Sequence, residues 1–375
     1  MKLLDFLRIL DRIAPLRLAE SWDNVGLLLG DPAADVRACM TCLTITPEVA
    51  REAVSEGADV VVTHHPILFR GAKAIRADVA GADVVWTLAR AGIAVVSHHT
   101  GWDSAQGGAN ECIARVLGLK DIEPMQPAQG PECVKFVIFV PDENLEAVRQ
   151  AAFEAGAGHI GLYDECSFSH PGHGTFRGNE GTNPTIGQPG RREEAAERRL
   201  EIICRKSQRA GVMAAIRAAH MYEEPAVDVY PLLDVALRSN EGVGRIGRAD
   251  ESSIRQVAKL AQDGLTSAAV QVALAEGVTP DSLAGQVAIA CGAGDDLVDG
   301  ALASGARVLV SGELRYHTIC KAAQAGLTTI LVGHHASERM SMELMAEVIR
   351  SAAGELRVWA ARSEKEPLIN LEKLT

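Results

Sequence analysis

The chain has 375 residues, of which 47% are hydrophobic and 23% are charged, and its formal net charge is -12. This composition excludes a disordered chain, and the length is sufficient for two cores or for one core with an inserted module. The acidic balance argues against a surface that binds duplex nucleic acid or an anionic membrane regardless of sequence.

The first twenty residues predict an amphipathic helix and not a secretion signal. Apolar residues repeat at helical spacing from Leu4 to Ile13, and charged residues such as Asp5 and Arg8 interrupt the apolar run. No stretch of the sequence approaches the roughly 20 apolar residues that a membrane span needs. We therefore expect a cytoplasmic protein.

Strands and helices alternate over residues 21–128. The polar turn Ser21-Trp22-Asp23-Asn24 leads into an apolar strand. The pattern then predicts strand 38–45, helix 47–56, strand 59–63, helix 80–91, strand 93–97 and helix 108–117. Strands separated by helices of this length imply a parallel sheet that is covered on both faces.

Eight cysteines are scattered through the chain without the spacing of a disulfide framework. Cys39 and Cys42 match a C-x-x-C motif, but they fall in the predicted strand 38–45. Residues three apart in a strand face opposite ways, so we interpret this pair as structural.

The pattern changes over residues 129–233, which we interpret as an insertion. It predicts strand 134–140, helix 144–155, strand 199–205, helix 210–219 and strand 226–230. Strand-helix-strand, repeated twice in about a hundred residues, indicates a ferredoxin-like α+β module. His170 and His173 lie in a glycine-rich span and could bind a metal, but we interpret that span as a mobile loop. The charge run 191–201 is interpreted as a solvated face that leads into a strand.

The alternating pattern resumes over residues 234–375. It predicts helix 253–262, strand 287–291, helix 296–304, strand 307–311, helix 318–325, strand 328–332, helix 337–352 and strand 356–361. Residues 53–63 resemble 301–311, and residues 89–99 resemble 323–335. The predicted fold class is therefore α/β, with two similar halves, 1–128 and 234–375, whose mainly parallel sheets form one core around a shared cleft.

Six of the eleven histidines form adjacent pairs, each at the end of a predicted strand: His64-His65, His98-His99 and His334-His335. Adjacent residues on a strand point in opposite directions, so each pair can serve one site only if the strand has ended, or if two metals lie on either side. The ends of strands are where open α/β sheets keep their ligands. Three histidine pairs at such positions indicate a metal site.

Two carboxylates lie near these histidines. Asp103 follows His99 by four residues and Glu338 follows His334 by four, a spacing that places both side chains on one face if the chain turns into a helix. Nitrogen and oxygen ligands without a thiolate suit Zn, Fe, Mn, Co or Ni and do not choose among them. Five or six such ligands exceed what one tetrahedral catalytic zinc uses, so two divalent ions bridged by a carboxylate fit better.

One further segment, Gly292-Ala293-Gly294-Asp295-Asp296, could contact a phosphate through its backbone amides. We interpret its acidic residues more simply as helix caps.

Several motifs together resemble the GTP cyclohydrolase 1 type 2 family, which is also called NGG-interacting-factor-three-like. The motifs are Ser21-Trp22-Asp23-Asn24-Val25-Gly26-Leu27, Thr63-His64-His65-Pro66, Ser97-His98-His99-Thr100 with Asp103, Ser311-Gly312-Glu313 with His317, and Gly333-His334 with Glu338. The resemblance covers nearly the whole chain. Within the insertion, Gly156-Ala157-Gly158-His159-Ile160-Gly161, Cys166-Ser167-Phe168, Gly174-Thr175-Phe176 and Ala219-His220-Met221-Tyr222-Glu223-Glu224 resemble the PII-like module of the long bacterial members.

The resemblance implies a toroidal homohexamer with a dinuclear metal centre. It implies that His64 and Asp103 hold one divalent ion, that His65 and His334 hold the other, and that Glu338 bridges them. His99 and His317 would support the ligands or face the substrate, which makes them the candidate catalytic residues. The chain departs from the family pattern at His335, where a tyrosine is common, and at Ser337, where a threonine is common.

The implied function is hydrolysis, because two divalent ions about 3.5–4 Å apart lower the pKa of a bridging water and stabilise charge on the attacked centre. The family name implies opening of the guanine imidazole ring of GTP, with a metal hydroxide attacking the ring carbon and His99 or His317 protonating the departing nitrogen. The expected substrate is a nucleotide-like or phosphate-bearing small molecule, although the chain has no G-x-x-x-x-G-K-[ST] loop. The alternative is a non-catalytic metal-binding scaffold whose PII-like insertion senses a small ligand or gates the cavity.

Overall fold

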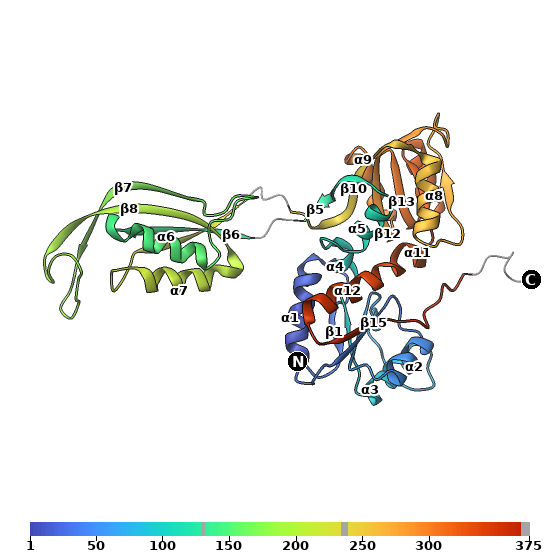
Figure 1. The fold of residues 1–375 in the computed structure, drawn as a ribbon, viewed down its shortest axis with the longest axis horizontal. Coiled ribbons are helices and arrows are strands. Elements are labelled where there is room, and N and C mark those ends of the chain that lie inside the picture. Colours follow the sequence, from blue (N-terminus) through green and yellow to red (C-terminus); the bar gives the residue numbers. More distant parts are fainter. Residues whose placement is uncertain (129–131, 234–238, 369–375) are drawn as a thin grey trace, which may run out of the picture. The chain divides into compact units, whose positions relative to one another are not determined.

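The computed structural model describes residues 1–128, 132–233 and 239–368, and it divides into two compact units (Figure 1). The core unit combines residues 1–128 with residues from 240 onward, and the insertion unit lies between them in the chain. The junctions expected after residues 128 and 233 border segments 129–131 and 234–238, which lie outside the described residues. No helix in the described part has both the length and the apolarity that crossing a membrane requires.

The first core sheet has five strands in the order β1-β4-β3-β2-β15. Its strands are β1 Gly26–Leu29, β2 Ala38–Cys42, β3 Val60–Thr63, β4 Ala94–Ser97 and β15 Arg357–Ala360. All neighbours are parallel except the edge strand β1, which runs antiparallel to β4. Parallel sheets are buried on both faces, which explains the continuous Val60-Val61-Val62 run in the centre.

Helices cover both faces of this sheet. The covering helices are α1 Leu3–Ile13, α2 Pro47–Ser55, α3 Ala82–Arg90 and α12 Ser341–Ala353. Cys39 packs into the cluster that contains residues of α1 and α12, whereas Cys42 packs into the cluster of α2 and α3. Because the two cysteines pack into different clusters, the expectation that they face opposite ways is confirmed. Both are buried and free.

The second core sheet has six strands in the order β11-β14-β13-β12-β10-β5. Its strands are β5 Lys120–Pro127, β10 Gly242–Ser253, β11 Gln271–Ala273, β12 Leu283–Ala293, β13 Val308–Glu313 and β14 Thr328–Leu331. The three central strands β12, β13 and β14 are parallel, and the others add antiparallel edges. Residues of α5 Ala109–Val116 and α8 Ile254–Gly264 pack in one cluster, and residues of α9 Val298–Ala303 and α10 Tyr316–Gln324 pack in another.

Each sheet of the core takes one strand from the other half of the chain. Strand β15 pairs with β2, and β5 pairs with β10. The sequence pattern placed strand 356–361 with the second half, and it did not predict β5, β10 or β11. Strand β5 contains Pro124 and Pro127, which an edge strand tolerates because one side of it needs no ladder hydrogen bonds. Figure 1 shows how the C-terminal part of the chain joins the first sheet: α12 runs beside α1 and leads into β15.

Two short helices that follow strands in the core carry four of the candidate site residues, His99, Asp103, His334 and Glu338. They are α4 His99–Ser104, which follows β4, and α11 His334–Arg339, which follows β14. The helix expected over residues 337–352 is therefore two helices, α11 and α12, separated at Met340. The described 3-10 helices are η1 Leu16–Leu18, η2 Asp142–Asn144, η3 Lys206–Gln208 and η4 Asp295–Leu297.

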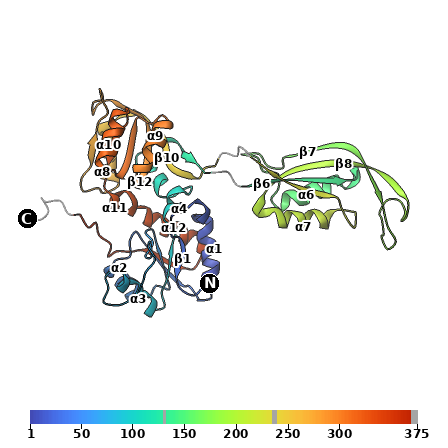
Figure 2. The same cartoon turned by 180° about the vertical axis from the view of Figure 1, so that it is seen from behind.

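The insertion unit is an antiparallel sheet with two helices on one face (Figure 2). Its elements are β6 Cys133–Val140, α6 Leu145–Glu154, β7 Ser167–Arg177, β8 Arg192–Arg205, α7 Arg209–Ala219 and β9 Val227–Leu232. The chain order β-α-β-β-α-β and the strand order β7-β8-β6-β9 are those of a ferredoxin-like module, as the sequence predicted. Apolar residues of α6, α7 and the sheet form its core.

The glycine-rich span of the insertion differs from the prediction. His170 and His173 do not lie in a mobile loop but in strand β7, which pairs with β8 from Ser167 to Arg177. The charge run 191–201 likewise forms most of β8. The end of this hairpin extends beyond β6 as a two-stranded ribbon, and its side chains are largely exposed. Because these strands bury few side chains, polar residues and glycines are compatible with their pairing.

One buried cation fixes the connection between the sheets. Arg245 of β10 is 1% exposed, and its guanidinium donates to backbone oxygens of Gly242, Gly244 and Ala105 at 2.8, 2.8 and 2.5 Å. Glu111 lies 3.6 Å from its Nε. Because Ala105 directly follows α4, this arginine ties α4 to the second sheet.

We expect Arg245→Ala to lower the free energy of unfolding by about 3–5 kcal/mol, because buried carbonyls and Glu111 would lose their cation. The measurement is urea unfolding followed by circular dichroism. The matched control is Arg248→Ala on the same strand, whose exposed ion pairs with Asp121 and Asp250 contribute less than about 1 kcal/mol. Equal effects of the two substitutions would contradict the proposed role of Arg245.

Candidate metal centre

The first histidine pair follows the end of β3. Strand β3 ends at Thr63, and the backbone N–H groups of His64 and His65 donate to Cys42 and Leu43 at 2.9 and 2.8 Å. The two rings lie 5.2 Å apart between centroids and are tilted by 58°. Of the two arrangements left open by the sequence, the strand has therefore ended, and both rings belong to one group of ligand atoms.

His99 begins α4 in an unusual backbone conformation. Its φ is 27°, a left-handed value that a non-glycine residue adopts only when its surroundings impose it. The Asp23 carboxylate supplies part of that constraint, since both of its oxygens lie 2.9 Å from His99 Nδ1 and one accepts from the Thr100 hydroxyl at 2.6 Å. Burial alone would raise the pKa of Asp23, but the hydrogen bonds from His99 and Thr100 outweigh it and lower the pKa.

The third cluster follows β14. Val332 N donates to Ser311 O at 3.0 Å, and Gly333 then adopts a φ of 92° that turns the chain into α11. His334 and Glu338, four residues apart in this helix, meet with 3.2 Å between Nε2 and Oε2. The predicted one-face arrangement of this pair is confirmed.

The Glu338 carboxylate lies at the centre of the group and is only 3% exposed. Its Oε2 lies 3.1 Å from His65 Nε2 and 3.2 Å from His334 Nε2. Its other oxygen, Oε1, lies 3.7 Å from His64 Nε2, which is itself 3.6 Å from Asp103 Oδ1. The two oxygens therefore face two different sets of side chains.

These side chains fit a metal. Two groups of side chains each bring three ligand atoms within 4.8 Å of one another. The groups are His64-His65-His99 and His65-His334-Glu338. Two ligands held at about 2.1 Å by a tetrahedral ion are about 3.4 Å apart, close to the separations seen here. Both ring nitrogens of His64 and Oε2 of Glu338 are buried without a hydrogen-bond partner in the described chain, which proteins rarely tolerate unless another group satisfies them.

The electrostatics of the two carboxylates differ. Burial raises the pKa of Asp103, although His64 opposes the shift. Burial also acts to raise the pKa of Glu338, but the nearby imidazoles of His334, His64 and His65 outweigh it and lower that pKa well below its usual range. Glu338 is therefore the carboxylate that stays ionised among the imidazoles.

Three of the histidines have a partner on Nδ1, which leaves Nε2 for the cleft. The partners are Thr44 for His65 at 2.7 Å, Asp23 for His99 at 2.9 Å and Glu313 for His334 at 3.0 Å. Such supporting partners fix the tautomer and the ring orientation of metal-binding histidines. Asp23 and Glu313 lie in the sequence motifs, but the motifs do not indicate this role, and no pattern in the sequence distinguishes Thr44.

Glycines let α11 approach the second sheet. Gly292 has a φ of +61°, and a Cβ there would collide with Glu338 Oε1. A Cβ at Gly312 would collide with Gly292 O and with Ser337 Oγ, which also accepts from Gly292 N at 2.9 Å. Asp295 of the same segment accepts from Arg315 N at the start of α10, so it caps α10 and not the helix that follows it in sequence.

The other histidines of these clusters lie elsewhere. His98 is buried and its Nδ1 contacts Ala14 O at 2.6 Å, while His335 Nδ1 lies 3.5 Å from Glu366. His317 lies exposed in α10 beside Tyr316, and the structure does not bring it to the groups of ligand atoms found among the described residues. Of the two candidate catalytic residues, the structure thus places only His99 beside His64 and His65.

The group opens into a cleft of about 600 Å³ that is also lined by Asp103, Asn110 and Cys291. The Cys291 thiol donates to Asp103 Oδ1 at 3.1 Å. At the mouth, Trp22 and Phe69 are 61% and 50% exposed, with ring centroids 6.0 Å apart. Their rings lie 6.2 and 6.4 Å from that of His99. The cleft therefore combines a histidine-rich floor with an aromatic rim.

We expect Asp23→Asn to weaken metal binding by about 10–100-fold, because His99 would lose the carboxylate that orients it. The measurement is competition for Zn²⁺ with a chromophoric chelator. Asp35→Asn is the control, since Asp35 forms only an exposed ion pair with Lys2. An unchanged affinity in Asp23→Asn would show that His99 does not contribute to the centre.

We also expect metal uptake to release protons. Burial opposes protonation of His64, but Asp103 and Glu338 raise its pKa to about 9. The adjacent Glu338 carboxylate raises the pKa of His334 to about 9. A metal ion binds only neutral imidazole, so the apparent affinity should rise with pH up to about 9 and level off above it.

Calorimetric titration of the metal-free protein near pH 7, in buffers of different ionisation enthalpy, counts the protons released, and we expect about two. In the metal-free protein the same raised pKa values stabilise the fold below about pH 6.5, and this stabilisation is lost as the pH rises through about 9. A heat of binding that does not depend on the buffer would contradict this prediction.

Comparisons with known proteins show to which family the chain is similar. The family model described as Duf34/NIF3 (NGG1p interacting factor 3) matches residues 1–367. A Mycobacterium tuberculosis protein named GTP cyclohydrolase 1 type 2 homolog is 39% identical over 359 residues, which are 94% of this chain and 93% of that protein. A Halalkalibacterium halodurans protein of the same name is 34% identical over 96% of each chain.

A solved structure shows the same fold. The crystal structure of a Bacillus cereus protein related to NIF3 is similar with a TM-score of 0.88 and 32% identity, and the match covers 99% of both chains. The family match spans both halves of the core and the insertion. The chain therefore belongs to the Duf34/NIF3 family.

Proposed function

We propose that this protein is a hydrolase that depends on two divalent metal ions, and that its substrate is a nucleotide-like or other phosphate-bearing small molecule. The observation that carries the proposal is the position of Glu338, whose Oε1 faces His64 and whose Oε2 faces His65 and His334. A carboxylate in this position can bridge two ions. The names of the relatives, GTP cyclohydrolase 1 type 2 homolog, support a nucleotide as the substrate.

In this proposal His64 and Asp103 hold one ion, His65 and His334 hold the other, and Glu338 contacts both. Divalent ions held in this way lower the pKa of water and stabilise charge that develops on an attacked centre. Zn, Fe, Mn, Co and Ni all suit these ligands. The protein's own contribution is to hold the imidazoles by Nδ1 and to bury the acceptor oxygens away from bulk water.

The remaining residues of the cleft would bind and orient the substrate. Trp22 and Phe69 offer aromatic faces at the mouth, and Asn24 holds the second of these in place by donating to Leu68 O at 2.6 Å. His99, oriented by Asp23, is the proposed proton donor to the leaving atom, and its ring also supports the ligands His64 and His65, beside which it lies. His317, which lies exposed in α10, remains the second candidate for that role.

Metal content per subunit tests the centre. The protein is purified without chelator or added metal, and the ions are counted by mass spectrometry. We expect two ions in the unchanged protein and none in Glu338→Ala, because the bridging carboxylate serves both sites. Glu343→Gln is the control, since Glu343 forms an exposed helix pair with Arg339.

Turnover is then measured with metal-loaded protein on a panel of nucleotides and phosphoesters. We expect hydrolysis that disappears in Asp103→Ala. No turnover on any compound, with Asp103→Ala still losing both ions, would exclude the hydrolase and leave the metal centre standing. His99→Gln separates the two roles open to His99: retained ions with lost turnover indicate a proton donor, whereas lost ions indicate a ligand.

The second candidate function is a non-catalytic metal-binding scaffold in which the insertion senses a small ligand. Two observations favour it. The insertion has its own hydrophobic core, and it has its own cavity.

A further inference from the structure

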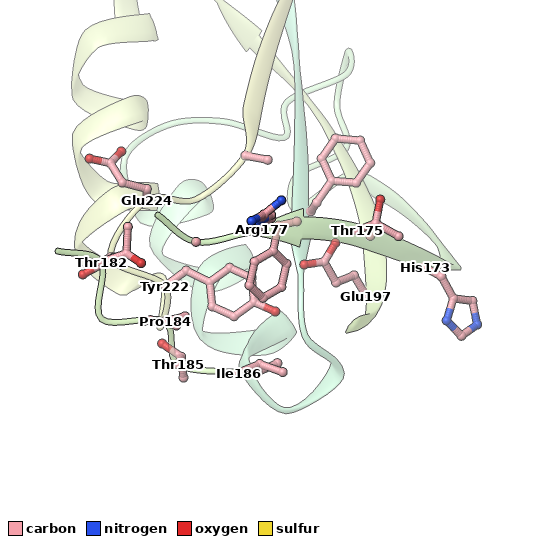
Figure 3. Close-up of a pocket in the computed structure, with 16 residues that line it drawn as sticks. His173, Thr175, Arg177, Thr182, Pro184, Thr185, Ile186, Glu197, Tyr222 and Glu224 are labelled. Carbon is pink, nitrogen blue, oxygen red and sulfur yellow. The ribbon is translucent and has the colours of Figure 1, made fainter. Parts of the chain in front are cut away.

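The insertion contains a cavity of about 480 Å³ that no residue of the metal centre lines (Figure 3). Its walls come from the end of the β7–β8 ribbon, from the loop that joins these strands and from residues 222–226. Cavities of this size accommodate small organic ligands.

Hydrogen bonds fold the β7–β8 loop back over this cavity. Asn183 N donates to Glu223 Oε1 at 2.9 Å, and the Thr185 hydroxyl donates to Met221 O at 3.0 Å. At the base of the loop, Gly190 N donates to Gly178 O at 2.7 Å. The loop is therefore attached to the segment after α7 and forms a defined wall.

A buried histidine fixes the opposite wall. His220 Nε2 lies 3.0 Å from Phe139 O, and its Nδ1 accepts from Tyr222 N at 3.1 Å. This pattern requires a neutral ring, and burial lowers the pKa of His220 accordingly. As a result, Tyr222 is held with its ring in the cavity, where Figure 3 shows it among the lining residues.

The cavity wall combines aromatic rings with a carboxylate that has no cationic partner. Phe139, Phe176 and Tyr222 supply the rings, and half-buried Glu197 supplies the carboxylate. Glu197 makes no ion pair with a described residue, although it is followed by two arginines in β8. Arg198 and Arg199 are already paired with Asp142 and Glu201.

Two further features describe the surroundings of the Glu197 carboxylate. Gly174 leaves room for it, because a Cβ there would collide with Glu197 Oε2. Burial and the nearby Glu197 charge raise the pKa of Tyr222 to about 12, so its hydroxyl remains a donor beside the carboxylate. Three glutamates, Glu197, Glu223 and Glu224, line the cavity against one arginine, Arg177.

We propose that this cavity binds an organic cation, a ligand with an ammonium or amidinium group on an apolar body. The cationic group would pair with Glu197, whose charge is partly removed from water, and the aromatic faces would attract the same charge. The apolar body would lie against Pro184, Ile186 and Phe176. An organic anion would be repelled by the three glutamates. A bare divalent ion would lack enough oxygen ligands, because rings and aliphatic groups form much of the wall.

The ligand class deepens the scaffold candidate above, in which the insertion senses a small molecule. Its test reads binding to the insertion and does not depend on turnover or on metal in the core. Either result therefore leaves the hydrolase proposal to its own experiment.

The test titrates the full-length protein with tryptamine by isothermal calorimetry and compares the neutral isostere tryptophol. We expect one tryptamine per chain, tryptophol at least about tenfold weaker, and tryptamine at least about tenfold weaker in Glu197→Gln. Glu180→Gln is the control, because it removes the same charge from the β7–β8 loop without lining the cavity. Thermal unfolding checks that each variant is folded.

A second variant, Ala226→Trp, fills the cavity from a different wall and should abolish binding without changing the charge. Equal affinities for tryptamine and tryptophol, or an unchanged tryptamine affinity in Glu197→Gln, would overturn the proposal. No binding of tryptamine by the unchanged protein would overturn it as well.

Discussion

The ionised carboxylate of Glu338, buried among the imidazoles of His64, His65 and His334, is the constraint on which the architecture of the core depends. A buried charge destabilises the fold strongly unless opposite charges, metals or hydrogen bonds compensate it. The compensating groups come from both sheets, because His64 and His65 follow β3 whereas His334 and Glu338 follow β14. The two sheets must therefore meet at the carboxyl ends of their parallel strands. The glycines at 292 and 312 let α11 lie close to β12 and β13, because a Cβ at either position would collide with Glu338 or Ser337 of that helix.

In three of the four histidines of this centre, the two ring nitrogens have different roles. Nδ1 of His65, His99 and His334 is occupied by a hydroxyl or carboxylate of the protein, which fixes the orientation of the ring. His64 has no such partner in the described chain and is held by complete burial and by the charges of Asp103 and Glu338. Asp103, His334 and Glu338 thus lie on short helices, and His64 and His65 directly follow a strand, so the ligand atoms are held close to rigid elements.

The sequence predicted the parts of the fold that depend on local patterns. Runs such as 60–63 and 94–97 identified the parallel strands, and three histidine pairs, two of them followed by a carboxylate at helical spacing, indicated a candidate metal site. It could not predict β5, whose prolines are tolerated because this strand lies at the edge of the sheet, or β10, whose glycines and charged residues leave no apolar run. The same holds for β7 and for Asp23: an exposed ribbon carries no burial pattern, and the contact with His99 spans 76 residues. His317 shows the opposite case, a motif residue that the folded chain leaves outside the group.

The junctions of the insertion have a consequence for the history of the chain. Pro127 and Gly242 are partners in the ladder between β5 and β10, and Ala128 N donates to Glu241 O at 2.9 Å. The polypeptide thus departs from the core and returns to it at neighbouring rungs, in the place where an ordinary hairpin would have a tight turn. A gene could gain, lose or exchange this module without breaking a single rung of the sheet, provided that the two ends of the newcomer lie close together.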